Sequence, residues 1–142
     1  MFFLDANIPM YAAGTESRYK AACVAILEAA ATGDLEAVCD TEILQEILYR
    51  YTHLGVHTAG IRVARDTIQA VPTVLPVFAR DVERAMILME QNSRLHSRDA
   101  LHAAVMLNNG IQEIITADRE FDVLRGMVTR HDPVAFARRL RG

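Results

Sequence analysis

Short apolar stretches that alternate with longer helical segments constrain the fold of this chain more than any other feature. Phe2-Phe3-Leu4, for example, is a run of three apolar residues that ends at the acid Asp5. Runs of this length are typical of strands buried on both faces, and the segments between them show helical spacing of their apolar residues. The alternation predicts a parallel sheet with helices on both faces, so we expect a three-layer α/β/α sandwich with four to five strands. The expected strands are 2–4, 35–39, 73–77, 113–116 and 127–129, and the expected helices are 15–31, 42–51, 57–69, 80–91, 98–108, 118–124 and a terminal one from Pro133.

Several residues predict where these helices begin and end. Thr41 and Ser97 are the expected N-caps of the helices that follow them, because a hydroxyl oxygen can accept a bond from a free backbone N–H. Gly33 and Gly110 are expected to end the preceding helices.

Length and composition favour one folded domain over residues 1–142. Half of the residues (51%) are apolar, Gly and Pro are scattered, and no apolar run is long enough to span a bilayer. The N-terminal apolar run is too short for a secretory signal. Cys23 and Cys39 stand alone, which favours buried thiols in a reducing compartment over a disulfide. We therefore expect a cytoplasmic protein.

The basic residues are almost all arginine. Fourteen of the fifteen are Arg and Lys20 is the single Lys, although the formal net charge is −3. Arginine binds phosphate through two parallel hydrogen bonds, which lysine cannot do. A codon preference for Arg would give the same composition, so the bias alone does not establish nucleic-acid binding.

Acidic residues follow two of the predicted strands at their carboxyl ends. Asp5 comes directly after the first strand, and Asp118 stands two residues after the strand at 113–116. In open α/β sheets the ligand sites lie outside the carboxyl ends of the strands. An unpaired charge beside a buried strand costs several kcal/mol, so Asp5 in particular needs a cation or an Arg partner.

Further acids lie at the beginnings of predicted helices and would reach the same edge. Glu42 and Glu46 share one helix face, Asp99 lies in a first helical turn, and Asp122 lies one turn past Asp118. Each of these acids could instead stabilise a helix dipole or lie in solvent. Gathered together, they would repel one another and require a proton or a divalent cation, and oxygen ligands favour Mg²⁺ or Mn²⁺ over Zn²⁺.

Four sequence blocks, in order, resemble those of the PIN-domain nucleases. The blocks are Phe2-Phe3-Leu4-Asp5-Ala6-Asn7, Thr41-Glu42-Ile43-Leu44-Gln45-Glu46-Ile47-Leu48, Arg98-Asp99-Ala100-Leu101-His102-Ala103-Ala104 and Thr116-Ala117-Asp118-Arg119-Glu120-Phe121-Asp122. Their order and spacing cover the chain from residue 1 to about 132, and its length resembles that of the VapC-type toxins of toxin–antitoxin pairs.

The resemblance implies a metal-dependent endoribonuclease. It assigns catalysis to Asp5, Glu46, Asp99 and Asp118, with Asp5, Asp99 and Asp118 as ligands of Mg²⁺ or Mn²⁺. Asn7 and Thr116 would orient these ligands or a water, and Asp122 would be an auxiliary acid. Glu46 is preferred to Glu42 because apolar residues follow it, as they follow the family's glutamate. The resemblance also implies an RNA substrate, an antitoxin partner and a homodimer.

Basic residues beside the acids could offset their repulsion of RNA. Arg98 and Arg119 are neighbours of two of the acids, and Arg50 lies one turn after Glu46, so we expect these three to contact phosphate. His102 lies on the Asp99 helix, where a packed or surface histidine is a simpler interpretation than a site residue.

Other functions stay open at this level. The chain could act mainly by binding a protein partner, or be an RNA-processing nuclease outside a toxin–antitoxin pair. A phosphatase of the haloacid-dehalogenase kind also begins with a strand and an Asp, but it requires a second Asp where this chain has Asn7.

Overall fold

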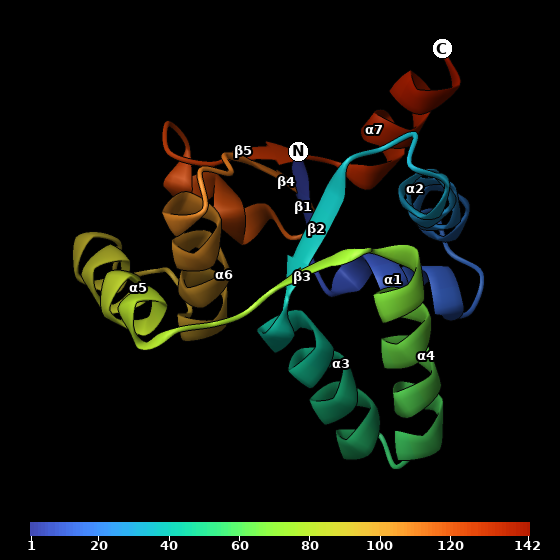
Figure 1. Cartoon of the computed structure of the whole chain (residues 1–142), viewed down its shortest axis with the longest axis horizontal. Coiled ribbons are helices and arrows are strands. Elements are labelled where there is room, and N and C mark those ends of the chain that lie inside the picture. Colours follow the sequence, from blue (N-terminus) through green and yellow to red (C-terminus); the bar gives the residue numbers. More distant parts are fainter.

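The computed structural model describes residues 1–142 as five parallel strands and eight helical segments (Figure 1). The expected α/β class and parallel sheet are confirmed. In chain order the elements are β1 (Phe2–Leu4), α1 (Asn7–Ala13), α2 (Lys20–Thr32), β2 (Ala37–Asp40), α3 (Thr41–His53), α4 (His57–Ala70), β3 (Thr73–Leu75), α5 (Ala79–Gln91), α6 (Ser97–Asn108), β4 (Glu113–Ile115), the 3₁₀ helix η1 (Arg119–Leu124), β5 (Thr129–His131) and α7 (Pro133–Arg141).

The strand order is β3-β2-β1-β4-β5, with β1 at the centre. Phe3 pairs with Val38 of β2 on one side and with Ile114 of β4 on the other. Parallel strands joined through helices are connected by right-handed crossovers. The chain therefore places α1 to α4 on one face of the sheet and α5 and α6 on the other. Figure 1 shows α5 and α6 together at the left, apart from α1, α2 and α4 at the right. No helix is long and apolar enough to cross a membrane.

One apolar core fills both interfaces between sheet and helices. Phe3, Ile114 and Ile115 from the central strands are fully buried, as are Ile26 of α2 and Met106 of α6. Helices cover both faces of the sheet, which is why β1 and β4 show little alternation of apolar with polar residues.

The first helical region differs from the expected helix at 15–31. The chain forms α1 directly after Asp5, then turns, and α2 begins only at Lys20. Pro9 lies in the first turn of α1, where its missing N–H is not needed. The turn is fixed by Ser17, whose hydroxyl accepts from Tyr19 N–H at 3.2 Å, and by Lys20, whose Nζ donates to the Gly14 carbonyl at 2.6 Å.

Both predicted hydroxyl N-caps are wrong. Asp40 caps α3, with its Oδ1 accepting from Ile43 N–H at 2.9 Å, and Thr41 is the first helical residue. His96 is the N-cap residue of α6 and provides no side-chain bond, so Ser97 already lies within the helix. The last strand also differs: β5 begins at Thr129, two residues after the expected start at 127. Val128 is buried in the turn that precedes it.

Candidate functional site

The site lies where the strand order reverses, between β1 and β4. The chain leaves β1 towards β2 on one side and returns through α5 and α6 to β4 on the other, which opens a crevice at the carboxyl ends of these two strands. Asp5 ends β1 and Thr116 ends β4, and Asp5 N–H donates to the Ile115 carbonyl at 3.2 Å. The pairing of the central strands thus brings residues 111 positions apart into one site.

Hydrogen bonds fix Asp5 at the base of the crevice. Its Oδ1 accepts from Ala6 N–H at 2.8 Å, and its Oδ2 accepts from the Thr116 hydroxyl at 2.7 Å and from Asn7 Nδ2 at 3.2 Å. The Thr116 oxygen in turn accepts from Asn7 Nδ2 at 2.8 Å and from Asp118 N–H at 3.0 Å. Asn7 and Thr116 therefore hold Asp5 in place and link it to the loop that carries Asp118.

Asp99 completes a group of three neighbouring carboxylates. It lies in the first turn of α6 and is 9% exposed. Burial raises the pKa of Asp99 to about 7, and the nearby charges of Asp5 and Asp118 add to the rise. Burial also raises the pKa of Asp5 above its usual range, against the lowering effect of His102 and of the Thr116 hydrogen bond. Burial is thus the main cause of both raised pKa values, and for Asp99 the neighbouring carboxylates contribute as well.

Glu46 enters the crevice from α3 and lies among three cationic groups. Its Oε1 is 3.5 Å from Arg98 Nε and 3.5 Å from His102 Nε2, and its Oε2 is 3.8 Å from Arg50 Nε. Glu46 is buried, whereas Glu42 lies one turn earlier on the same wall and is only partly buried. Both glutamates line the groove, and the choice of Glu46 over Glu42 as the catalytic acid stays a prediction.

His102 and Asp40 form a buried pair beneath Glu46. His102 Nδ1 lies 2.8 Å from Asp40 Oδ2, and both side chains are fully buried. Burial alone would lower the pKa of His102, but the hydrogen bonds to Asp40 and Glu46 and the charge of Asp5 outweigh it and raise this pKa to about 10. The sequence favoured a packed or surface histidine at position 102, and Asp40 was not among the predicted site residues. The position of Asp40 at the end of β2 was the available signal, since the carboxyl ends of the strands were where ligand sites were expected.

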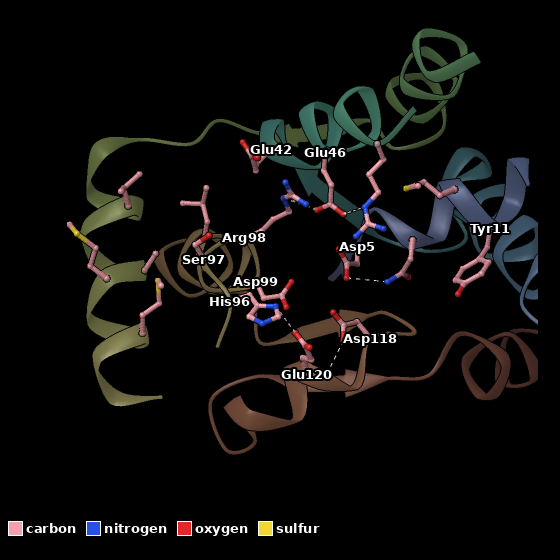
Figure 2. Close-up of a pocket in the computed structure, with 18 residues that line it drawn as sticks. Asp5, Tyr11, Glu42, Glu46, His96, Ser97, Arg98, Asp99, Asp118 and Glu120 are labelled. Atoms are coloured by element: carbon pink, nitrogen blue, oxygen red, sulfur yellow. Dashed lines mark hydrogen bonds and ion pairs between the residues drawn. The ribbon is translucent and has the colours of Figure 1, made fainter. Parts of the chain in front are cut away.

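The crevice opens into a groove of about 1000 Å³ between α3, α5 and α6. Figure 2 shows Asp5, Glu46, Asp99 and Asp118 directed towards a common space at its base. The α5 wall is apolar, with Val82, Met86 and Met89. The predicted site residues that line the groove are Asp5, Asn7, Glu46, Arg50, Arg98, Asp99 and Asp118.

The remaining predicted residues lie elsewhere. Thr116 is buried beneath Asp5, and Arg119 is exposed outside the groove lining. Asp122 accepts from Arg130 Nε at 3.0 Å, and this bond lowers the pKa of Asp122. Asp122 is therefore engaged in pairing η1 with β5 and does not face the groove.

Two residues that the sequence reasoning did not select also line the groove. His96 Nδ1 lies 3.1 Å from Glu120 Oε2, and their ligand atoms are within 4.8 Å of those of Asp99. Both side chains are largely exposed at the rim of the groove. His96 lies outside the four sequence blocks and Glu120 lies within the fourth. The two come close only because the loop before α6 meets η1.

The donor set fits a divalent cation. Asp5, Asp99 and Asp118 offer oxygen ligands at the base of the groove, and the charges of Asp5 and Asp118 help to raise the pKa of Asp99, as close carboxylates do. The buried His102 is a poor ligand, because Asp40 and Glu46 occupy both of its ring nitrogens. Oxygen ligation without histidine or cysteine is typical of Mg²⁺ or Mn²⁺ sites.

Comparison with known proteins agrees with the geometry. The PIN domain family matches residues 2–127. A VapC ribonuclease of Mycobacterium bovis is 39% identical over 128 residues, which cover 89% of this chain and 97% of the relative. Ribonuclease VapC23 of Mycobacterium tuberculosis is 30% identical over 118 residues, which cover 83% of this chain and 93% of the relative.

Several solved structures share the fold. The crystal structure of M. tuberculosis VapC20, described as a toxin that cleaves the sarcin–ricin loop, superposes with a TM-score of 0.73 at 18% identity, covering 88% of this chain and 95% of that one. The crystal structure of VapBC2 from Rickettsia felis, bound to a DNA fragment from its promoter, superposes with a TM-score of 0.70 at 14% identity. The match covers 92% of this chain and 98% of that one. The chain belongs to the PIN-domain family, in its VapC ribonuclease branch. The predicted family is thereby confirmed, and the phosphatase alternative is excluded.

Proposed function

We propose that this chain is an endoribonuclease that hydrolyses RNA phosphodiester bonds as the toxin of a VapBC-type pair. The convergence of Asp5, Asp99 and Asp118 at the base of one open groove carries this proposal. The groove has a volume of about 1000 Å³, and Arg50 and Arg98 stand on its wall. Sequence-specific RNA recognition commonly uses single-stranded segments.

Asp5, Asp99 and Asp118 would hold the divalent cation, Mg²⁺ or Mn²⁺. When bound, the cation supplies positive charge that activates water and stabilises the departing oxygen. The hydrogen bonds from Asn7 and Thr116 leave Asp5 little freedom to turn, so its carboxylate is already oriented.

Glu46 would accept the proton of the attacking water. It enters the groove from α3 and faces the three ligand acids across its base, so a water beside those acids would lie within its reach. Arg50 and Arg98 contact Glu46 only at 3.8 and 3.5 Å and are partly exposed, so both can turn to a phosphate.

The apolar α5 wall supports the antitoxin as the protein partner. Met86 is 52% exposed and Met89 37%, and methionine packs well against varied apolar side chains. A toxin–antitoxin complex of Klebsiella pneumoniae shares the fold with a TM-score of 0.66 at 15% identity, covering 94% of this chain and 98% of that one. We further propose that the chain forms a homodimer and acts in the cytoplasm.

The deciding experiment is an RNA digest by purified protein with Mg²⁺ or Mn²⁺, repeated with EDTA and with Asp5→Asn. We expect cleavage by the wild type without EDTA, and none with EDTA or by Asp5→Asn. The control Asp122→Asn should cleave like the wild type because Asp122 does not line the groove. Equal cleavage in all samples would refute the metal mechanism. A complete lack of cleavage of transfer, ribosomal and messenger RNA would favour a protein-binding module instead.

A further inference from the structure

Three acids and one histidine make up the buried polar group beneath the groove. Asp5, Asp40 and Glu46 are all less than a tenth exposed, and His102 is completely buried among them. This buried group joins three elements, because Asp40 ends β2, Glu46 lies on α3 and His102 lies on α6. A buried charge is tolerated only when it is paired and hydrogen-bonded, so this arrangement is costly to assemble without a purpose.

The two ring nitrogens of His102 have different neighbours. Nδ1 is fixed by Asp40 at 2.8 Å, whereas Nε2 points to Glu46 Oε1 at 3.5 Å. Asp40 is itself held by the cap bond from Ile43 N–H at 2.9 Å. The Asp40 contact and complete burial therefore restrain the imidazole, and its Nε2 faces one oxygen of Glu46.

The other partners of Glu46 are less permanent. Arg50 is 56% exposed and Arg98 35%, and the proposed function draws both towards the RNA phosphates. His102 cannot follow them, because it has no exposed surface. Once RNA is bound, His102 is the cationic neighbour that stays with Glu46.

We propose that His102, held by Asp40, is a positioning residue that keeps the Glu46 carboxylate oriented towards the reacting water. This inference rests on the proposed function, in which Glu46 accepts the proton. His102 itself contacts neither RNA nor water in this scheme. It acts only through Glu46, and that restriction makes the proposal testable.

A double-mutant cycle tests it with His102→Gln, Glu46→Gln and the double variant, in a steady-state RNA cleavage assay. His102→Gln should lower kcat by about tenfold to a hundredfold, the usual effect of losing a group that orients a site residue, with KM changed less than about threefold. In the Glu46→Gln background the same change should have no further effect on kcat. Additive losses would overturn the proposal, as would an unchanged kcat in His102→Gln.

The matched control is His131→Gln. His131 is also a mostly buried histidine paired with a glutamate, with Nε2 at 3.0 Å from Glu113 Oε1, but it lies on β5 away from the groove. Its loss should leave kcat at the wild-type value. Unchanged cleavage by Glu46→Gln alone would instead refute the role of Glu46 in the proposed function.

Nuclear magnetic resonance provides a measurement that needs neither activity nor a His102 variant that folds. In the wild type, both His102 ring N–H protons should be protected from exchange. Glu46→Gln should shift the Nε2 proton and leave the Nδ1 proton, held by Asp40, in place. An Nε2 signal that does not respond to Glu46→Gln would show that the two side chains do not interact, whatever the cleavage assay gives.

Discussion

The replacement of Asp40 by alanine removes two interactions with one side chain. Oδ1 of Asp40 caps α3 through Ile43 N–H, and Oδ2 binds His102 Nδ1 at 2.8 Å. Asp40 and His102 are both fully buried, so water cannot replace either bond without opening the core. We expect Asp40→Ala to be among the most destabilising substitutions outside the apolar core.

The expected magnitude follows from these two contacts. Loss of an N-cap costs about 1 kcal/mol. Removing one partner of a buried ion pair costs about 3 to 5 kcal/mol, and the lower end applies because Glu46 remains near the His102 ring at 3.5 Å. Asp40→Ala should therefore lower the free energy of unfolding by about 4 kcal/mol. Asp40→Asn keeps an acceptor for the cap bond and should lower it by about 3 kcal/mol.

The loss of stability caused by Asp40→Ala should also depend on pH. The pKa of His102 is raised from 6.5 to about 10, so its stabilising charge is fully present below pH 6.5 and is lost as pH rises through about 10. The variant has already lost the main partner of that charge. The difference in unfolding free energy between wild type and Asp40→Ala should therefore narrow as pH rises from 7 towards 10.

Urea unfolding followed by circular dichroism measures these differences. With a urea m-value of about 2 kcal/mol/M, the midpoint should fall by about 2 M for Asp40→Ala. The control is Asp132→Ala, which removes the N-cap of α7, with bonds to Val134 and Ala135 N–H, but no ion pair. It should lower the midpoint by only about 0.5 M. Equal shifts for the two variants would refute the idea that Asp40 stabilises a buried charged His102.

Three further expectations concern the metal, the helix packing and the surface. Because the pKa of Asp99 is raised to about 7, protons compete with the cation below that pH, and calorimetric titration should show weaker Mn²⁺ binding at pH 5.5 than at pH 7.5. Gly60→Ala should lower stability by about 1 to 3 kcal/mol in thermal melts, since a Cβ there would lie 2.5 Å from Tyr51 Cβ in the α3–α4 contact. Asp122→Ala should cost no more than about 1 kcal/mol by urea unfolding, because its Arg130 pair is partly exposed.

The strands and most of the acids at their ends could be predicted from local signals. Apolar runs mark strands wherever they are buried on both faces, and their alternation with helices requires a parallel sheet. Asp5 was identifiable because it directly follows such a run, and Asp99 because it opens a helix near the same edge. These features depend only on neighbours in the chain.

The N-cap prediction failed where local signals compete, and the surroundings of Asp122 were not predictable from its spacing. Thr41 and Asp40 are both good N-caps, and the structure uses Asp40 because its second oxygen also satisfies His102 across the core. Asp122 has the spacing of a site acid, but it is engaged by Arg130 from β5. In each case the deciding contact comes from another element: His102 lies 62 positions from Asp40, and Arg130 lies eight positions from Asp122.

The sequence by itself therefore determined the fold class, the family and the edge of the sheet where the acids gather. These follow from periodicity and from the order of residues along the chain. Only the tertiary structure decided which groups surround Glu46 and that His102 lies between two carboxylates. Such contacts depend on which strands are neighbours and how each helix is rotated against the sheet, and the packing of the whole core sets both.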